Sequence, residues 1–283
     1  MTKKVVVLGG QGMLGQAIAE RLNAFDLSVF SRSDLDISCA DQLHTKLFQL
    51  QPDYIINCAA YTAVDLAEEE IEKAFMLNGL AVEKLAQISQ QLSATLIHFS
   101  TDYVFDGKAS NPYRPDDETA PINVYGASKL RGEQSMRKTN GKYYIFRISW
   151  LYAPHGKNFF KWVATTDQTD LKVVNTQTGC PTSALDVADF IGHVINQDPE
   201  AYGTYHFANK GVMTWYDFAV AINKELQLKR NISPVAEFKT AAKRPKYSVM
   251  DTKATEKTFG YTIPEVTVSL KTVADKISDG GQL

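Results

Sequence analysis

The fold of this chain is decided by Val5-Val6-Val7-Leu8-Gly9-Gly10-Gln11-Gly12-Met13-Leu14-Gly15. The first four residues are apolar and mostly β-branched, as in a strand that is buried on both faces. Apolar residues then recur at helical spacing, at Leu14, Ala17, Ile18 and Leu22. A strand, a glycine-rich turn and a helix together let backbone N–H groups approach a pyrophosphate at the positive end of the helix. The stretch therefore predicts an α/β fold with a dinucleotide-binding turn.

The glycines at positions 9, 12 and 15 have the spacing G-x-x-G-x-x-G, which departs from the G-x-G-x-x-G form. This variant resembles the turn of the extended short-chain dehydrogenases/reductases. A glycine-rich turn without a ligand is the alternative. Arg32 follows the second expected strand, residues 27–30, and an arginine there suits the 2′-phosphate of NADP. We therefore expect NADPH, with NADH as a second possible cofactor and a solvated surface arginine as the alternative for Arg32.

Two further strands are expected over residues 53–57 and 95–99, with a long amphipathic helix over residues 68–91 between them. The second of these strands delivers Thr101 and Asp102 to its carboxyl end, which is the edge of an open α/β sheet where ligands bind. The Thr101 hydroxyl can donate to a substrate oxygen, and the Asp102 carboxylate can accept from a sugar hydroxyl. His98, inside the strand, is interpreted as a packed core histidine.

A tyrosine and a lysine open the next expected helix, which Asn123 is expected to cap. Tyr125 and Lys129 are four residues apart and lie on one helix face, which places the ammonium beside the phenol. A nearby cation lowers the pKa of a tyrosine, about 10 when isolated, as an acid/base tyrosine requires. An exposed pair without chemistry is the alternative for this spacing alone. Together with the glycine turn and Thr101, the pair predicts an extended short-chain reductase.

Bulk composition excludes several classes of protein. The 283 residues carry a formal net charge of −2, which argues against nucleic acid as the main partner. The apolar run at residues 5–8 is too short for a targeting segment, and no stretch is long enough to cross a bilayer. The three cysteines have no metal-ligand spacing and are an odd number for a disulfide framework. We therefore expect a cytoplasmic protein with no membrane contact and no metal site.

The last third of the chain has a mixed pattern. A strand is expected over residues 142–148, followed by shorter strands and helices, among them a helix over residues 214–226 with Thr214 as its N-cap. We predict a Rossmann-type doubly wound parallel sheet over residues 1–151. A smaller mixed α/β substrate lobe is predicted over residues 152–283, with the chain crossing back into the first domain.

Six motifs run in order along most of the chain: Asn57-Cys58-Ala59-Ala60-Tyr61-Thr62-Ala63-Val64-Asp65, Ser100-Thr101-Asp102-Tyr103-Val104-Phe105-Asp106-Gly107, Ile148-Ser149-Trp150-Leu151-Tyr152, Gly156-Lys157-Asn158-Phe159, Gly179-Cys180-Pro181-Thr182 and Lys243-Arg244-Pro245. This series resembles the dTDP-4-dehydrorhamnose reductase family, which reduces the 4-keto group of a dTDP-deoxysugar to give dTDP-L-rhamnose. Cys58 stands where that family more usually has a small alanine, and a reactive thiol near the cofactor is one consequence to check.

The resemblance implies roles for individual residues. Thr101, Tyr125 and Lys129 match the catalytic residues. The positions implied at the cofactor are Gly9, Gln11, Gly12, Met13, Leu14, Gly15, Arg32, Asp36, Ile37, Ala59, Ala60, Tyr61, Thr62, Tyr125 and Lys129. The positions expected at the substrate are Thr101, Asp102, Tyr125, Trp150 and Arg244. For Arg244 the reason is that a guanidinium matches the geometry of a nucleotide diphosphate, and a surface salt bridge is the alternative.

The function that the resemblance implies is NAD(P)H-dependent reduction of dTDP-4-dehydro-L-rhamnose to dTDP-L-rhamnose, with the dTDP-deoxysugar as partner and a homodimer left open. One alternative is a related nucleotide-sugar reductase or epimerase. Another is a non-catalytic regulatory subunit on the same fold, like the beta subunit of methionine adenosyltransferase. The joint presence of Thr101, Tyr125 and Lys129 favours an enzyme.

Overall fold

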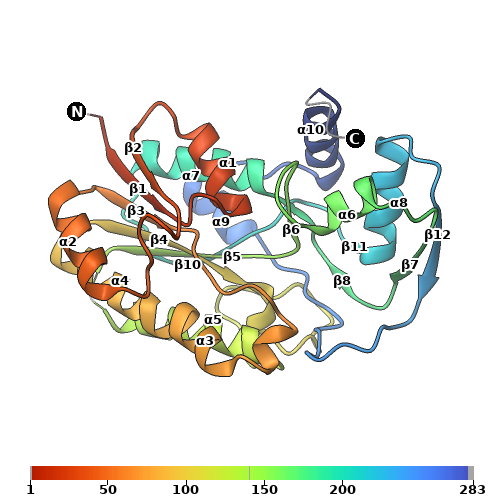
Figure 1. The fold of residues 1–283 in the computed structure, drawn as a ribbon, viewed down its shortest axis with the longest axis horizontal. Helices are drawn as coiled ribbons and strands as arrows, with labels where there is room; N and C mark the ends of the chain where they lie inside the picture. Colours follow the sequence, from red (N-terminus) through yellow and green to blue (C-terminus); the bar gives the residue numbers. More distant parts are fainter. Residues whose placement is uncertain (1, 140, 280–283) are drawn as a thin grey trace.

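In the computed structural model, which describes residues 2–139 and 141–279, a six-stranded parallel sheet has the order β10-β5-β4-β3-β1-β2 (Figure 1). Its strands are β1 (Lys4–Leu8), β2 (Asp26–Phe30), β3 (Tyr54–Asn57), β4 (Thr95–Thr101), β5 (Tyr143–Ile148) and β10 (Gly203–Phe207). The strand order reverses between β1 and β3, since β2 lies on one side of β1 and the later strands lie on the other. The predicted doubly wound sheet is confirmed, and its switch point lies between β1 and β3.

Alternate residues of β1 face opposite layers of helices. Val5 and Val7 pack in an apolar cluster with residues of α1 and α7, whereas Val6 and Leu8 pack with residues of α2 and α4. Figure 1 shows α1 and α7 on one side of the sheet and α2, α4 and α5 on the other. Both faces of β1 are therefore buried, as its β-branched run predicted. These helices are α1 (Met13–Arg21), α2 (Ala40–Leu50), α4 (Ala81–Gln91), α5 (Val124–Lys138) and α7 (Ala184–Gln197).

The single helix expected over residues 68–91 is divided into several segments. A 3-10 turn, η1 (Leu66–Glu68), comes first, and α3 (Ile71–Phe75) follows it. A π-helical turn, η2 (Met76–Leu80), then joins α3 to α4. The amphipathic pattern continues through all of these segments, so its periodicity could not distinguish them.

The π-helical turn connects the loop after β3 to helix α5 through one buried side chain. The Asn78 amide nitrogen donates to the Tyr61 carbonyl and to the Ser128 hydroxyl, both at 2.9 Å. Its oxygen accepts from the Tyr61 N–H at 2.8 Å. Turns of this type occur frequently at functional sites. Here the turn fixes the position of a predicted cofactor loop relative to the helix that carries Tyr125 and Lys129.

Helix α5 begins as predicted. The Asn123 side-chain oxygen accepts from the Gly126 N–H at 2.7 Å, which makes Asn123 the N-cap. A Cβ atom at Gly126 would lie 2.1 Å from the Tyr103 carbonyl oxygen, so only glycine allows the helix to approach the end of β4 this closely. The cap and the glycine together place the first turn of α5 against the carboxyl edge of the sheet.

Beyond β5, short elements form a smaller unit, at the right of Figure 1. β7 pairs with β12 and β6 with β9 in parallel, whereas β8 pairs with β11 in antiparallel fashion. The elements concerned are β6 (Leu151–Tyr152), α6 (Phe159–Thr165), β7 (Asp170–Val174), β8 (Thr178–Gly179), β9 (Thr182–Ser183), β11 (Met213–Thr214), α8 (Trp215–Glu225) and β12 (Asn231–Val235). Thr214 caps α8 in a reciprocal arrangement with Asp217, as expected for its N-cap.

Parts of the later chain also pack on the main sheet. β10 pairs in parallel with β5, α7 packs on α1, and α9 (Lys253–Phe259) packs on β10 before the final helix α10 (Val266–Asp279). The division into two domains at residue 151 stays a prediction, and residues 280–283 of the predicted lobe lie outside the described residues. Within the described part of the chain, no helix is both long and apolar enough to span a membrane.

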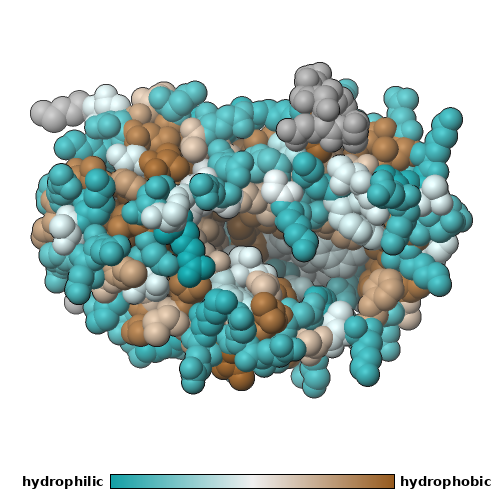
Figure 2. Space-filling model, in the orientation of Figure 1, coloured by the Kyte–Doolittle hydropathy of each residue, from teal (hydrophilic) through white to brown (hydrophobic). Residues whose placement is uncertain are grey.

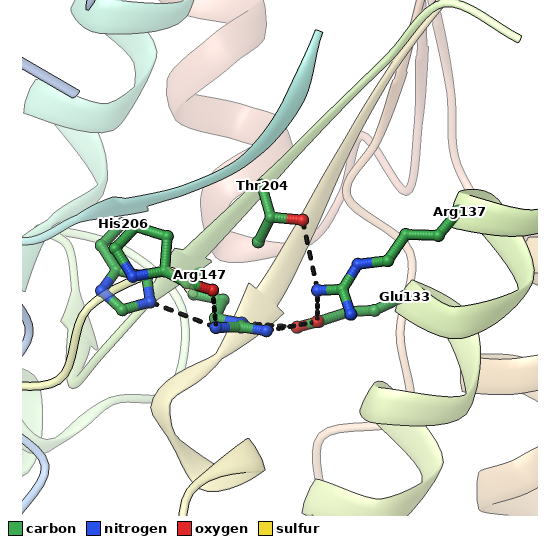
Figure 3. Close-up of polar contacts among 6 residues, drawn as sticks. Glu133, Arg137, Arg147, Thr204 and His206 are labelled. Atoms are coloured by element: carbon green, nitrogen blue, oxygen red, sulfur yellow. Dashed lines mark hydrogen bonds and ion pairs between the residues drawn. The ribbon is translucent and has the colours of Figure 1, made fainter. Parts of the chain in front are cut away.

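A buried ion pair joins α5 to the sheet beneath the candidate site (Figure 3). The Nε and Nη2 atoms of Arg147 on β5 donate to the two carboxylate oxygens of Glu133 at 2.9 and 2.7 Å, and both side chains are almost inaccessible to solvent. Arg137 donates a further bond to Glu133 at 2.7 Å. The Nη1 atom of Arg147 donates to the Pro115 carbonyl at 3.2 Å and lies 3.3 Å from the His206 Nε2 atom.

This network predicts a characteristic pattern of stability losses. Arg147→Met should lower the free energy of unfolding by about 3–5 kcal/mol, because it leaves the Glu133 carboxylate buried without its main partner. The double variant Glu133→Leu/Arg147→Met should lose clearly less than the sum of the two single changes, because it leaves no unpaired buried carboxylate. Urea denaturation of the three variants measures both values. Additive losses would show that the two side chains contribute independently.

Candidate active site

Two backbone segments meet at the switch point of the sheet. Gly9, after β1, has a φ of +79°, and a Cβ atom there would lie 2.7 Å from the Ala59 nitrogen in the loop after β3. A Cβ atom at Gly15 would lie 2.3 Å from the Gly9 carbonyl oxygen. Glycine is therefore required at both positions. The G-x-x-G-x-x-G spacing corresponds to a turn that packs against both its own helix and the next loop.

A pocket opens beside this turn, and its lining residues are Gly9, Gln11, Gly12, Arg32, Leu35, Asp36, Ile37, Cys58, Ala59, Ala60 and Leu77. It brings together eight of the positions predicted at the cofactor. The Arg32 side chain is 71% exposed at the rim, and its Nε atom donates to Asp36 at 3.0 Å. A cation at the rim and a backbone floor are features that suit a phosphorylated nucleotide.

Other predicted cofactor positions lie outside this lining. The Met13 carbonyl accepts from the His155 side chain at 2.8 Å, and the Leu14 side chain is buried in the apolar core. Tyr61 donates its hydroxyl hydrogen to Glu70 at 2.9 Å, and Thr62 follows it in the same loop. Tyr125 and Lys129 lie further along the edge of the sheet, on α5.

The predicted acid/base pair is completed by a hydroxyl at the end of β4. Thr101 is buried, and its hydroxyl shares a hydrogen bond with the Tyr125 phenol. Burial raises the pKa of Tyr125 to about 12, although the hydrogen bond with Thr101 acts in the opposite direction. The Tyr103 ring meets the Tyr125 ring edge-on, with 5.8 Å between centroids. Tyr125 therefore keeps its proton at neutral pH.

The Lys129 amine is bound to strand β4. Its Nζ atom donates to the Phe99 carbonyl at 2.6 Å and lies 3.3 Å from the His98 Nε2 atom. Burial lowers the pKa of Lys129 to about 8, although the Glu133 carboxylate acts to raise it. The structure therefore does not show the expected lowering of the Tyr125 pKa by Lys129. The physical reason is that burial dominates at Tyr125, while the amine makes its contacts with Phe99 and His98.

Asp102 lies directly beside Thr101 and is also buried. Its Oδ1 atom accepts from the Thr101 hydroxyl at 3.1 Å, and the Ser248 hydroxyl is hydrogen-bonded to the same carboxyl group. Burial raises the pKa of Asp102 to about 6, against the influence of these hydrogen bonds. Cys58 lines the pocket at the switch point, and burial raises the pKa of its thiol, which makes it a poor nucleophile. The reactive thiol considered from the sequence is thus not what the structure shows.

Trp150 has its indole ring packed between other groups. It adopts a left-handed backbone conformation, with a φ of +48°. Its ring stacks on the Trp215 ring with 3.7 Å between centroids and 5° between planes. A Cβ atom at Gly179 would lie 2.6 Å from the same ring, so glycine is needed there too. Trp215, at the start of α8, is partly buried and packs against the main apolar core.

Arg244 forms the salt bridge that the sequence allowed as an alternative. Its Nη1 and Nη2 atoms donate to the Asp65 carboxylate at 3.1 and 2.6 Å. A groove of about 1120 Å³ lies beside it, lined by Asp106, Gly107, Lys108, Ile122, Thr176, Gln177, Glu237, Phe238, Lys239, Thr240, Ala242, Lys243, Arg244 and Lys246. Figure 2 shows the molecule hollowed between the sheet and the smaller unit on this face.

Two polar residues near Lys129 were not predicted as part of the site. His98 is buried, as the sequence interpretation had it, yet its ring contacts the lysine amine. Asn57 lies in register with His98 on the neighbouring strand and is hydrogen-bonded to it at 3.1 Å. Asn57 ends an apolar strand with a buried amide, which is the signal that could have indicated it. Its hydrogen bond to His98 could not be predicted, because it depends on the register between β3 and β4.

Comparisons with known proteins agree with this arrangement over most of the chain. Residues 3–278 match the family described as RmlD substrate binding domain. A protein of Escherichia coli strain K12 named dTDP-4-dehydrorhamnose reductase is 34% identical over 291 aligned residues, which cover 96% of this chain and 97% of that protein. A spore coat polysaccharide biosynthesis protein of Bacillus subtilis strain 168 is 37% identical over 259 aligned residues, which cover 89% and 90% of the two chains.

A crystal structure shows the same similarity in three dimensions. The dTDP-4-dehydrorhamnose reductase of Bacillus anthracis strain Ames, solved in complex with NADP, superposes with a TM-score of 0.94. It is 36% identical in sequence, and the match covers 98% of this chain and all of that one. The similarity therefore includes both the sheet and the smaller unit.

Proposed function

The chain belongs to the RmlD substrate binding domain family, and from this premise we propose that it reduces the 4-keto group of dTDP-4-dehydro-L-rhamnose to give dTDP-L-rhamnose, with NADPH as the reductant. The observation that carries the proposal is the meeting of Thr101, Tyr125 and Lys129 at the carboxyl end of β4. Ligands bind at this edge in open α/β sheets. The names of the relatives, dTDP-4-dehydrorhamnose reductases, support the same substrate.

The pocket at the switch point fits a dinucleotide. Gly9 and Gly12 line it without side chains, so backbone N–H groups can approach a pyrophosphate at the start of α1. Arg32, exposed at the rim, can bind a 2′-phosphate if its guanidinium gives up the ion pair with Asp36. NADPH, when bound, supplies the hydride for the carbonyl carbon. The relative from Bacillus anthracis, solved with NADP, supports this choice of cofactor.

The residues of the chain supply a proton and hold the reacting oxygen. Tyr125, whose pKa is about 12, keeps its proton at neutral pH and can give it to the oxygen as negative charge develops there. The Thr101 hydroxyl, bonded to the same phenol, lies where it can contact that oxygen. In its ammonium form, Lys129 would place a positive charge one helical turn from the tyrosinate that remains, an effect that burial outweighs in the protonated Tyr125. The Asp102 carboxyl group is adjacent to Thr101 and can accept from a sugar hydroxyl.

The groove beside Arg244 suits the nucleotide diphosphate of this substrate. Its lining includes the cationic side chains of Lys108, Lys239, Lys243, Arg244 and Lys246. Phosphate oxygens are favourable partners for such side chains. Arg244 would keep or share its bond to Asp65 when a diphosphate is present.

Two related assignments depend on the same proposal. A homodimer stays a prediction. A cytoplasmic location is supported by three free cysteines, one of them exposed, because exposed thiols persist in a reducing compartment. A related nucleotide-sugar reductase or epimerase, and a regulatory subunit on this fold, are the functions against which the enzyme assay must discriminate.

The first prediction tests the proton donor. Tyr125→Phe keeps the ring and most of its packing but removes the hydroxyl, so kcat should fall at least about 100-fold. The affinity for NADPH and the melting temperature should hardly change. The measurement is the loss of NADPH absorbance with dTDP-4-dehydro-L-rhamnose, run beside UDP- and GDP-linked 4-keto-sugars. Wild-type rates in the Phe variant would place the proton donor elsewhere. Tight NADPH binding by a wild type that reduces none of these sugars would favour the regulatory function.

A second prediction tests the cofactor choice. Arg32→Ala should weaken NADPH binding by about tenfold, the lower end of the range for a hydrogen bond to a charged group, and should leave NADH binding nearly unchanged. Fluorescence titration with both nucleotides measures this. Arg21→Ala, which removes an arginine paired with Asp189, is the matched control. Equal losses for NADPH and NADH would remove Arg32 from the 2′-phosphate site.

A third prediction concerns the sugar contact. Trp150→Phe should raise the KM for the sugar by about 3- to 10-fold, since a smaller ring loses aromatic contact area, while cofactor affinity stays the same. Trp162→Ala, which alters a tryptophan 40% exposed on α6, is the control. A lower melting temperature with an unchanged KM would mean that Trp150 serves packing against Trp215 and not the sugar.

A further inference from the structure

We propose that His98 is a positioning residue for Lys129. A chain of hydrogen bonds that starts at the loop after β3 orients the His98 ring, and the ring in turn holds the Lys129 amine and disfavours its ammonium form. The proposal rests on the proposed function in one respect, namely that Lys129 takes part in the reaction. The chain consists of Ala59, Asn57, His98, Lys129 and Phe99, in that order. Each step of it involves a main-chain group or a buried side chain.

The first step fixes the orientation of an amide. The Ala59 N–H donates to the Asn57 Oδ1 atom at 3.1 Å. An N–H group requires an oxygen acceptor, so the Asn57 NH2 group must face the other way, towards the His98 Nδ1 atom at 3.1 Å. Turning the amide over would leave the Ala59 N–H against another donor. Such an unsatisfied group is costly inside a protein.

The second step fixes the tautomer of the imidazole. Because the Asn57 NH2 group donates to Nδ1 of His98, the neutral ring carries its hydrogen on Nε2. Burial and the nearby Lys129 hold the pKa of His98 well below its ordinary value, so the ring is neutral. The Nε2–H bond then points at the Lys129 Nζ atom, 3.3 Å away.

The third step concerns the charge of the lysine. A protonated amine has only donor hydrogens, so it cannot accept from the His98 Nε2–H group. A neutral amine can accept this hydrogen and still donate to the Phe99 carbonyl at 2.6 Å. All donors and acceptors of the chain are then matched. Burial of Lys129 acts in the same direction, and its pKa of about 8 agrees with the geometry.

The other titratable groups beside the amine do not reverse this. In the described part of the chain they are Cys58 from the loop after β3 and Glu133 from the same helix. Both act to favour the charged amine, but the Cys58 thiol is neutral because burial raises its pKa. The Glu133 carboxylate is itself bonded to Arg147 and Arg137. His98 is therefore the neighbour of the amine that decides its preferred charge, because the loop after β3 places the imidazole hydrogen on Nε2.

The consequence is a limit on activity at high pH. The ammonium form of Lys129 is the form that stabilises the tyrosinate, so kcat/KM should fall as the pH rises through the pKa of Lys129. Asn57→Asp keeps an acceptor for the Ala59 N–H and turns the histidine into its Nδ1–H tautomer, so that Nε2 can accept from the ammonium. The fall in kcat/KM should then move to higher pH by roughly one pH unit, because a hydrogen bond now favours the charged form and a buried carboxylate adds to it.

A second variant separates the imidazole from that added charge. His98→Gln places an amide that can turn its oxygen towards the amine, so it should also move the fall in kcat/KM to higher pH, without any new carboxylate. The matched control is His193→Gln on α7, which should leave the pH profile unchanged. The Nε2 atom of His193 is hydrogen-bonded to the Phe259 carbonyl at 2.7 Å. Folded His98→Gln and Asn57→Asp variants with the wild-type profile would overturn the proposal.

A measurement on the wild-type protein needs neither turnover nor a stable variant. Nitrogen-15 NMR of the imidazoles should show that the buried His98 ring stays neutral and carries its hydrogen on Nε2. The His98 signals are those lost in His98→Gln, which separates them from those of His206, the other buried imidazole of β4 and β10. A hydrogen on Nδ1 would refute the proposal even in an active enzyme. The expected tautomer without any turnover would instead count against the proposed function alone.

Discussion

The close approach of two main-chain segments at the switch point is the constraint on which the rest of the site depends. Gly9 and the backbone of Ala59 lie so near each other that no Cβ atom fits between them. The floor of the pocket is therefore main chain, with the N–H groups at the start of α1 available to an anion. The same Ala59 N–H donates to Asn57, so the loop that forms this floor also orients the amide beneath Lys129. The pocket at the switch point and the sheet edge that carries Thr101 are thus parts of one packed arrangement.

Burial favours the uncharged forms of both Tyr125 and Lys129, although it shifts their pKa values in opposite directions. It raises the pKa of Tyr125 and lowers that of Lys129, so the uncharged form of both is favoured. Specific contacts work against this, namely the Thr101 hydroxyl at the phenol and the Glu133 carboxylate near the amine. A reductase needs a tyrosine that still holds its proton and a lysine that can be charged when the proton leaves. Partial compensation of burial by a few polar neighbours meets both requirements.

Local patterns in the sequence were sufficient for the sheet and for part of the site. The strand–turn–helix at residues 5–22, the Asn123 cap and the position of Thr101 each depend on neighbours in the chain, and all are found. The partners of His98, Arg147 and Trp150 could not be predicted, because each lies on another element and depends on strand register or helix packing. The direction of the Lys129 amine was missed for the same reason. Helical spacing places Tyr125 and Lys129 on one face, but the carbonyl of Phe99 on β4 determines where the amine points.

Residues of the later half of the chain bind directly to α5, the helix that carries Tyr125 and Lys129. Arg147 joins Glu133 of α5 to His206 on β10, a strand that lies in the sequence between β9 and β11 of the smaller unit. At the start of the same helix, the Asn123 amide nitrogen donates to the Lys243 carbonyl at 2.8 Å. Helix α5 is thus bound at its N-cap and at Glu133, in its later half, to residues that come after it in the sequence. The contact with Lys243 therefore links the N-cap of α5, two residues before Tyr125, to the segment of chain that follows β12.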